Sequence, residues 1–73
     1  MKINVNSINE FCKLFRMNIL KLSLQEVSGI TGIKLSTLSS FENGRSNNLK
    51  YINVYYSIGN EEQREYFTNN LFS

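Results

Sequence analysis

Residues 23–44 read SLQEVSGITGIKLSTLSSFENG, and this stretch decides the fold that we expect for the chain. Ser23 is followed three residues later by Glu26, which is the spacing of a capping box at the start of a helix. Gly32 supplies a residue that tolerates a positive φ, as the end of a helix often requires. The first half of the stretch therefore predicts a short helix that begins after Ser23 and ends at Gly32.

A second short helix is predicted directly after Gly32. Its apolar side chains recur every three or four residues, so they share one face of a helix and leave polar side chains on the other face. The positions expected to face inward are Ile33, Thr37, Leu38 and Phe41, and those expected to face outward are Lys34, Ser36, Ser39 and Ser40. Residues 42–44, Glu-Asn-Gly, suit the end of this helix.

Two helices joined at a steep angle by three or four residues with a glycine form a helix-turn-helix, whose second helix can enter the major groove of DNA. A helical hairpin with no role in DNA binding is the alternative. The sequence resembles the lambda-repressor and Cro-like (XRE) family in a set of short segments. These segments are Leu22-Ser23, Gln25-Glu26-Val27-Ser28, Gly32-Ile33, Ser36-Thr37-Leu38-Ser39 and Phe41-Glu42-Asn43-Gly44.

The resemblance implies both a fold and a function. It implies an all-α, five-helix lambda-repressor-like domain over residues 1–73, with the helix-turn-helix over residues 23–44. It also implies a sequence-specific DNA-binding transcriptional regulator that acts as a homodimer on paired half-sites of double-stranded DNA. Because a fold alone does not determine function, the function depends on the side chains that the fold exposes.

The composition is that of a small globular domain and excludes several kinds of chemistry. Of the 73 residues, 41% are hydrophobic and 19% are charged, which favours a folded chain over a disordered one. The chain has no His, which excludes a nucleophile activated by histidine, and its single Cys excludes a conventional zinc site. We therefore expect no enzyme activity, no catalytic residue, no metal and no cofactor. Cys12 lies in an apolar stripe and is expected to be a buried small hydrophobe.

Charge and apolar runs bear on the partners and location of the protein. A net charge of +2 permits nucleic-acid binding without requiring it, because such proteins usually carry a strongly basic face. No apolar run approaches the roughly 18 residues that span a bilayer, and residues 1–4 are not followed by the apolar core of a signal peptide. We therefore expect a cytoplasmic protein with no membrane contact. The abundance of Asn, Ile and Lys is typical of AT-rich coding and indicates a phage or a low-GC bacterium.

One helix is predicted before the helix-turn-helix, after a polar lead-in over residues 1–7 that is either an extended arm or frayed chain. Ser7 and Glu10 have capping-box spacing. The apolar stripe that follows is Ile8, Phe11, Cys12, Phe15 and Ile19. In the family that the chain resembles, an Arg late in this helix pairs with the Glu found here as Glu42. Arg16 lies one residue further from Leu22 than is usual, so an ion pair between Arg16 and Glu42 stays open.

Two helices are predicted after the helix-turn-helix. Asn48 can cap the first of these two helices, and Gly59 ends it. The β-branched and tyrosine residues of this helix are also compatible with a strand. Its expected inward positions are Leu49, Ile52 and either Tyr55 or Tyr56. Asn60 and Gln63 form a capping box for the last helix. Its expected inward positions are Tyr66, Phe67 and Leu71.

The resemblance assigns two sets of DNA contacts. The set predicted to bind phosphate, at the start of the first helix of the pair and beyond the end of the second, is Ser23, Gln25, Asn43, Arg45 and Lys50. The set predicted to read bases is Lys34, Leu35, Ser36, Ser39 and Ser40. Lysine can donate to guanine O6 and N7, serine can donate or accept, and a leucine methyl group can contact the C5-methyl group of thymine. The alternative for the serines is a solvated helix face with no partner.

Apolar residues on the predicted DNA-facing surface leave a second function open. Leu24, Ile30 and Leu35 stand where relatives usually place polar residues, and an exposed apolar patch there suits a protein partner. The runner-up is therefore a small phage-type protein that binds and modulates a host protein through the same fold.

The C-terminal half contains all four tyrosines and suggests a contact between copies. Tyrosine and phenylalanine are favoured at interfaces, so we predict a homodimer interface that includes Tyr55, Tyr66 and Phe67. The alternative is that these rings fill the core of the domain.

Overall fold

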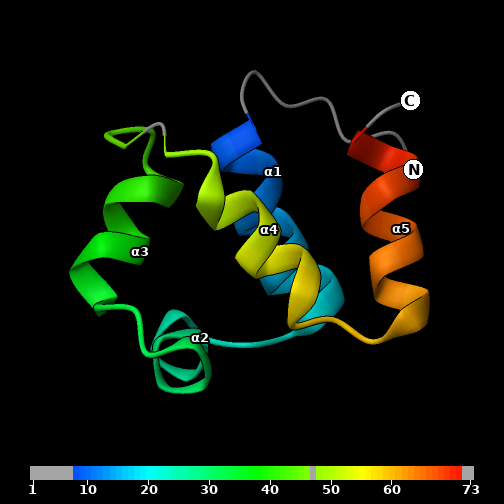
Figure 1. Cartoon of the computed structure of the whole chain (residues 1–73), viewed down its shortest axis with the longest axis horizontal. Helices are drawn as coiled ribbons and strands as arrows, with labels where there is room; N and C mark the ends of the chain where they lie inside the picture. Colours follow the sequence, from blue (N-terminus) through cyan, green and yellow to red (C-terminus); the bar gives the residue numbers. More distant parts are fainter. Residues whose placement is uncertain (1–7, 47, 72–73) are drawn as a thin grey trace.

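The computed structural model describes residues 8–46 and 48–71, except for the side chain of Leu71, and every regular element in this part of the chain is a helix (Figure 1). The elements are α1 (Ile8–Leu14), the π-helix η1 (Phe15–Leu20), α2 (Leu24–Thr31), α3 (Leu35–Glu42), α4 (Lys50–Ser57) and α5 (Glu61–Leu71). The predicted all-α class is confirmed. The lead-in over residues 1–7 with the Ser7 cap, and the inward position of Leu71, lie outside what is described.

The local signals for both ends of α2 and for the start of α5 are confirmed, whereas α4 is flanked by Leu49 and Ile58 rather than by the predicted Asn48 and Gly59. Ser23 Oγ accepts from the Glu26 backbone N–H at 3.0 Å, and the Ser23 N–H donates to Glu26 Oε1 at 2.9 Å, which completes the capping box of α2. Gly32 ends α2 with a φ of 75°. Asn60 and Gln63 form the same reciprocal pair at the start of α5, at 2.8 and 2.9 Å. Short-range chemistry therefore sets these boundaries.

The first helix differs from its prediction in its second half. A continuous α-helix was expected, but η1 follows α1 and ends at Lys21, a residue in the left-handed region with a φ of 55°. The Lys21 N–H donates to Arg16 O. A π-helix bonds residue i to i+5 rather than to i+4, so it accommodates one more residue per turn than an α-helix does. The spacing between Arg16 and Leu22 is accommodated in this way.

Aromatic rings fill the centre of the molecule. Phe67 of α5 meets Phe11 and Phe15 edge to face, with ring centroids 5.0 and 4.9 Å apart. On the α3 side, Phe41 packs against Tyr51 and Tyr55. Figure 1 shows α4 between α3 and α5. Tyr51 and Tyr55 of α4 contact Phe41, and Tyr56 contacts Phe67 with ring centroids 5.7 Å apart, so α4 meets both groups of rings. The buried core is Phe11, Cys12, Phe15, Val27, Leu38, Phe41, Tyr51, Tyr55 and Phe67.

This core corrects two predictions. Tyr55 is 0% exposed and Phe67 is 2% exposed, so neither can form a dimer interface, and the alternative that these rings fill the core holds for both. Tyr66 is half-buried and stacks on Phe15. Leu49 was expected to face inward but is 68% exposed, because α4 begins one residue later and buries Tyr51 and Tyr55 instead.

Cys12 is buried, as predicted, and its environment suppresses thiol chemistry. Burial raises the pKa of the Cys12 thiol to about 12, and the Glu42 carboxylate adds to the effect. At pH 8 only about one thiol in ten thousand is then ionised, and the thiolate is the reactive form. We expect iodoacetamide at pH 8 to label Cys12 only after urea unfolds the chain, as measured by mass spectrometry. Rapid labelling of the folded protein would contradict this burial.

No helix in the described part of the chain is both long enough and apolar enough to cross a membrane.

Candidate nucleic-acid interface

Three residues, 32–34, join α2 to α3 and form a tight corner. The Ser28 hydroxyl donates to Ile33 O at 2.6 Å, and the Ile33 N–H donates to Thr31 Oγ1 at 3.3 Å. In Figure 1, α2 is seen nearly end-on while α3 runs along the side of the molecule, so the two helices meet at a steep angle. These hydrogen bonds hold α3 in a fixed direction relative to α2.

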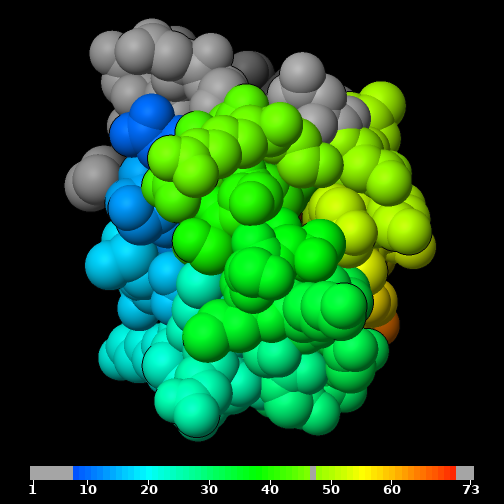
Figure 2. Space-filling model, turned by 90° about the vertical axis from the view of Figure 1, so that its left-hand side faces the viewer, coloured from blue at the N-terminus to red at the C-terminus, as the bar shows by residue number. Residues whose placement is uncertain are grey.

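The outer face of α3 is open to solvent. Leu38, Phe41 and Glu42 are buried, which fixes the inner face of the helix. Lys34, Leu35 and Ser36 are exposed, whereas Ser39 and Ser40 are half-buried. Figure 2 shows α3 lying across this side of the molecule, with α2 below it and the segment after α3 above it. The predicted base-reading residues therefore lie on one accessible helix face, most fully at its N-terminal end.

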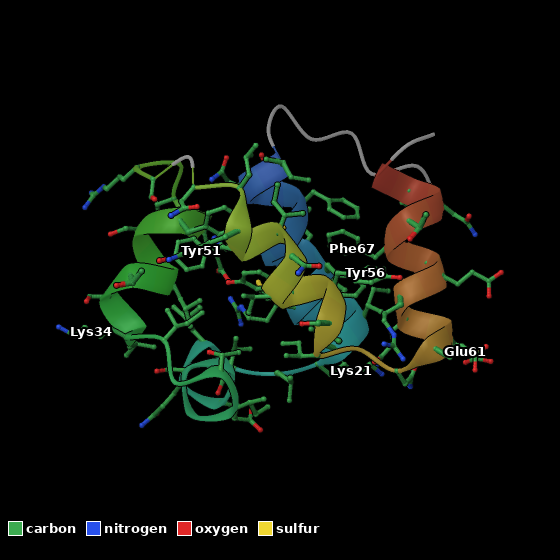
Figure 3. All side chains as sticks on the ribbon, viewed as in Figure 1. Lys21, Lys34, Tyr51, Tyr56, Glu61 and Phe67 are labelled. Atoms are coloured by element: carbon green, nitrogen blue, oxygen red, sulfur yellow. The ribbon has the colours of Figure 1, made fainter. Side chains whose placement is uncertain are left out.

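Lys34 lies at the N-terminal end of α3, but its side chain does not cap the helix. Lys34 is the residue before the first helical turn, and its side chain makes no capping hydrogen bond. Figure 3 shows the Lys34 side chain pointing away from the molecule. A helix N-terminus and a cation placed together favour an anionic ligand. Leu35, beside it, is 46% exposed and adds an apolar group to the same end.

The predicted phosphate contacts fall into two groups of unequal charge. Asn43, Arg45 and Lys50 follow α3 and are all exposed. Ser23 and Gln25, at the start of α2, are exposed too, but they flank the Glu26 carboxylate. Hydrogen bonds with Ser23 lower the pKa of Glu26 and keep its carboxylate anionic. The bond from the Ser23 backbone N–H is the larger cause, and the bond with the Ser23 side chain is the smaller one. The side after α3 is therefore the better match for phosphate.

A buried charged cluster ties the end of α3 to its neighbours. Arg16 Nε and Nη2 donate to Glu42 Oε2 and Oε1 at 2.8 and 3.0 Å, and Nη1 donates to Leu22 O at 2.8 Å. The Tyr55 hydroxyl also donates to Glu42 Oε2. The hydrogen bond to Glu42 raises the pKa of Arg16. Burial is the largest cause that raises the pKa of Tyr55, and the hydrogen bond to Glu42 raises it further. Glu42 is thus a structural partner, and its side chain is buried rather than exposed on the outer face of α3.

Asn9 is a residue that sequence reasoning missed. It is 5% exposed, and its Nδ2 donates to Phe41 O at 2.7 Å and to Ser46 O at 3.1 Å. It therefore joins α1 to the last turn of α3 and to Ser46 in the segment that follows α3. No pattern in the sequence indicates these contacts, because the carbonyl groups that Asn9 binds are 32 and 37 residues away in the chain.

Charge is distributed unevenly along the sequence and across the molecule. Residues 1–60 carry seven Lys or Arg and three Glu, whereas residues 61–73 carry one Arg and three Glu. The net charges of these two parts are therefore +4 and −2. Figure 3 shows Lys34 and Glu61 at opposite sides of the molecule. The exposed Lys34, Arg45 and Lys50 lie between the start of α3 and the start of α4, whereas Glu61 and Glu62 are in the first turn of α5. A polyanion would accordingly be attracted to the α3 side and repelled from the start of α5.

The described residues contain no group of three or more His, Cys, Asp and Glu side chains that could hold a metal ion. No protein-family model, curated protein or solved structure matches the chain. The likeness to the lambda-repressor family therefore depends on the sequence segments over residues 22–44 alone.

Proposed function

We propose that this chain is a lambda-repressor-like, cytoplasmic helix-turn-helix protein that binds double-stranded DNA and regulates transcription, with no enzyme activity of its own. The observation that carries the proposal is the exposed N-terminal end of α3, where Lys34, Leu35 and Ser36 project from a helix whose opposite face is fully buried. The tight corner before α3 and the Glu42 cluster behind it fix the helix from both ends.

This surface would make two kinds of contact with DNA: contacts to phosphate, which position the protein, and contacts to bases, which read the sequence. Arg45 and Lys50, with Asn43, would bind the phosphate backbone beside the groove, and this contact carries no sequence information. Lys34 would donate to guanine, and Leu35 would contact a thymine methyl group on an adjacent base pair. The half-buried Ser39 and Ser40 contribute less, because less of each side chain is accessible.

The proposal includes a homodimer on paired half-sites, as the family resemblance implies. The contact between copies must use side chains other than Tyr55 and Phe67, which lie in the core. Of the three residues predicted for this interface, Tyr66 alone retains accessible surface.

Titration of labelled duplex DNA at two salt concentrations tests the proposal. If Lys34, Arg45 and Lys50 each neutralise one phosphate, the affinity of one domain should fall about 40-fold between 50 and 200 mM salt. Fluorescence anisotropy with a pool of random 30-base-pair duplexes measures this dependence. Absence of binding at 50 mM salt would contradict the proposal.

One observation favours the runner-up function, which is binding to a host protein. Ile30 and Leu35 are 60% and 46% exposed, and large apolar side chains on a surface suit a protein partner. Leu24, which was expected to share this surface, is half-buried and packs against the core. The Ile30→Ser substitution separates the two functions, because it removes an exposed apolar anchor of a protein interface at a residue that is assigned no contact to DNA.

A further inference from the structure

The two carbonyl groups that Asn9 binds bracket Asn43 and Arg45, two of the residues proposed to contact phosphate. Phe41 is in the last turn of α3, and Ser46 lies beyond Arg45. A carboxamide has two N–H donors on one nitrogen, so it can satisfy both carbonyl groups at once. Asn9 Nδ2 does so at 2.7 and 3.1 Å, from a position 32 and 37 residues away in the chain.

Backbone hydrogen bonds of the same segment connect it to its own helix. The Gly44 N–H donates to Phe41 O at 3.1 Å, and the Arg45 N–H donates to Ser40 O at 2.9 Å. Gly44 has a φ of 79°, so the chain turns sharply here. Asn9 adds a connection to α1, and this connection reaches the far end of the segment at Ser46.

We infer that Asn9 is a positioning residue for phosphate binding. Its side chain holds the Phe41 and Ser46 carbonyl groups together. The segment between them then presents Arg45 and Asn43 to a phosphate group in a fixed geometry. A prearranged segment loses less conformational entropy when it binds, so fixing it increases affinity without adding a contact. Asn9 is buried and touches no DNA itself. This inference rests on the proposed function.

The test compares Asn9→Leu with a matched substitution on the other side of the molecule. Leucine has a similar shape but no donor, so both carbonyl groups lose their partner. Gln63→Met is the control, because Gln63 Nε2 makes a similar long-range hydrogen bond to Ile19 O at 3.1 Å, remote from α3. Asn9→Ser keeps one donor and is the milder variant if Asn9→Leu does not fold.

Three measurements are made on each folded variant. We expect Asn9→Leu to weaken binding to duplex DNA about tenfold and to lower the salt slope by about one ion, since the Arg45 contact is lost. Amide hydrogen exchange of Gly44 and Arg45 should quicken, with no change in α5. In an Arg45→Gln background, Asn9→Leu should have almost no further effect on affinity, because the two residues act on one contact. Gln63→Met removes the capping partner of Asn60 and should quicken exchange at the start of α5, but it should leave the affinity for DNA, the salt slope and the exchange of Gly44 and Arg45 unchanged.

The outcomes distinguish this inference from the proposed function. If the unsubstituted protein binds duplex DNA and Asn9→Leu binds it equally well with the same salt slope, the inference is overturned and the proposed function stands. Equal losses of affinity from Asn9→Leu with and without Arg45 would also overturn it. If the unsubstituted protein binds no duplex at 50 mM salt, both are overturned.

Discussion

Substitution of Lys34 by glutamate should abolish specific DNA binding, with a loss of at least about 100-fold in affinity at 100 mM salt. A bidentate lysine contact to guanine contributes about 1–3 kcal/mol, and the reversed charge adds repulsion from the phosphates. Lys34 is exposed and lies at the start of α3, so the substitution removes a contact without disturbing the core. Arg45→Glu should have a similar effect through the phosphate contact. Fluorescence anisotropy against the preferred duplex measures both losses.

The matched control is Arg64→Glu, which changes the net charge by the same two units. Arg64 is exposed on α5, away from α3. If only the total charge of the protein matters, the Lys34 and Arg64 variants should lose affinity equally, and the proposed interface would be wrong. We expect the Arg64 variant to retain its affinity to within about threefold, because charges beyond a Debye length of roughly 8–10 Å are screened. A protein-binding function through Ile30 and Leu35 would leave the Lys34 variant active toward that partner.

Substitution of Glu42 by leucine should unfold the chain, or nearly so. Glu42 is the acceptor for both Arg16 and Tyr55, and all three side chains are buried. Loss of one partner of a buried ion pair costs about 3–5 kcal/mol, because the other charge is left without compensation. A chain of this length has a free energy of unfolding of only about 4–11 kcal/mol. Urea denaturation followed by circular dichroism at 222 nm measures the change.

A triple variant, Arg16→Met with Glu42→Leu and Tyr55→Phe, provides the control. It replaces the whole cluster by apolar side chains of similar size, so no buried charge or hydroxyl group lacks a partner. Such replacements are often neutral or stabilising. We expect the triple variant to recover most of the stability that Glu42→Leu loses. If Glu42→Leu alone costs less than about 1 kcal/mol, the cluster does not stabilise the fold as argued here.

Much of the fold could be predicted because its signals are local. The capping boxes at Ser23 and Asn60 and the glycine at position 32 act over three or four residues, so the sequence shows them directly. The inward face of α3 followed from its apolar spacing. The phase of α4 could not be predicted in this way, since apolar or aromatic residues occupy most of its positions. Packing against Phe41 of α3 and Phe67 of α5 selects which rings are buried.

The candidate site was predicted less completely, for a related reason. Exposed side chains such as Lys34 and Arg45 follow from helix periodicity and loop position. Asn9 and the partners of Glu42 depend on residues more than ten positions apart, and no local pattern reports such contacts. The spacing between Arg16 and Leu22 even argued against the Arg16 to Glu42 pair, because the π-helix that closes this gap leaves no clear mark in the sequence.

The wide turn of η1 gives this architecture a place where its length can vary. The π-helical turn before α2 accommodates one residue more than an α-helical turn would, and the guanidinium of Arg16 still reaches Glu42. The exposed residues of this turn include Met17 and Asn18, so the wide turn lies partly at the surface. The longer spacing between Arg16 and Leu22 is therefore compatible with a direct contact between η1 and the end of α3.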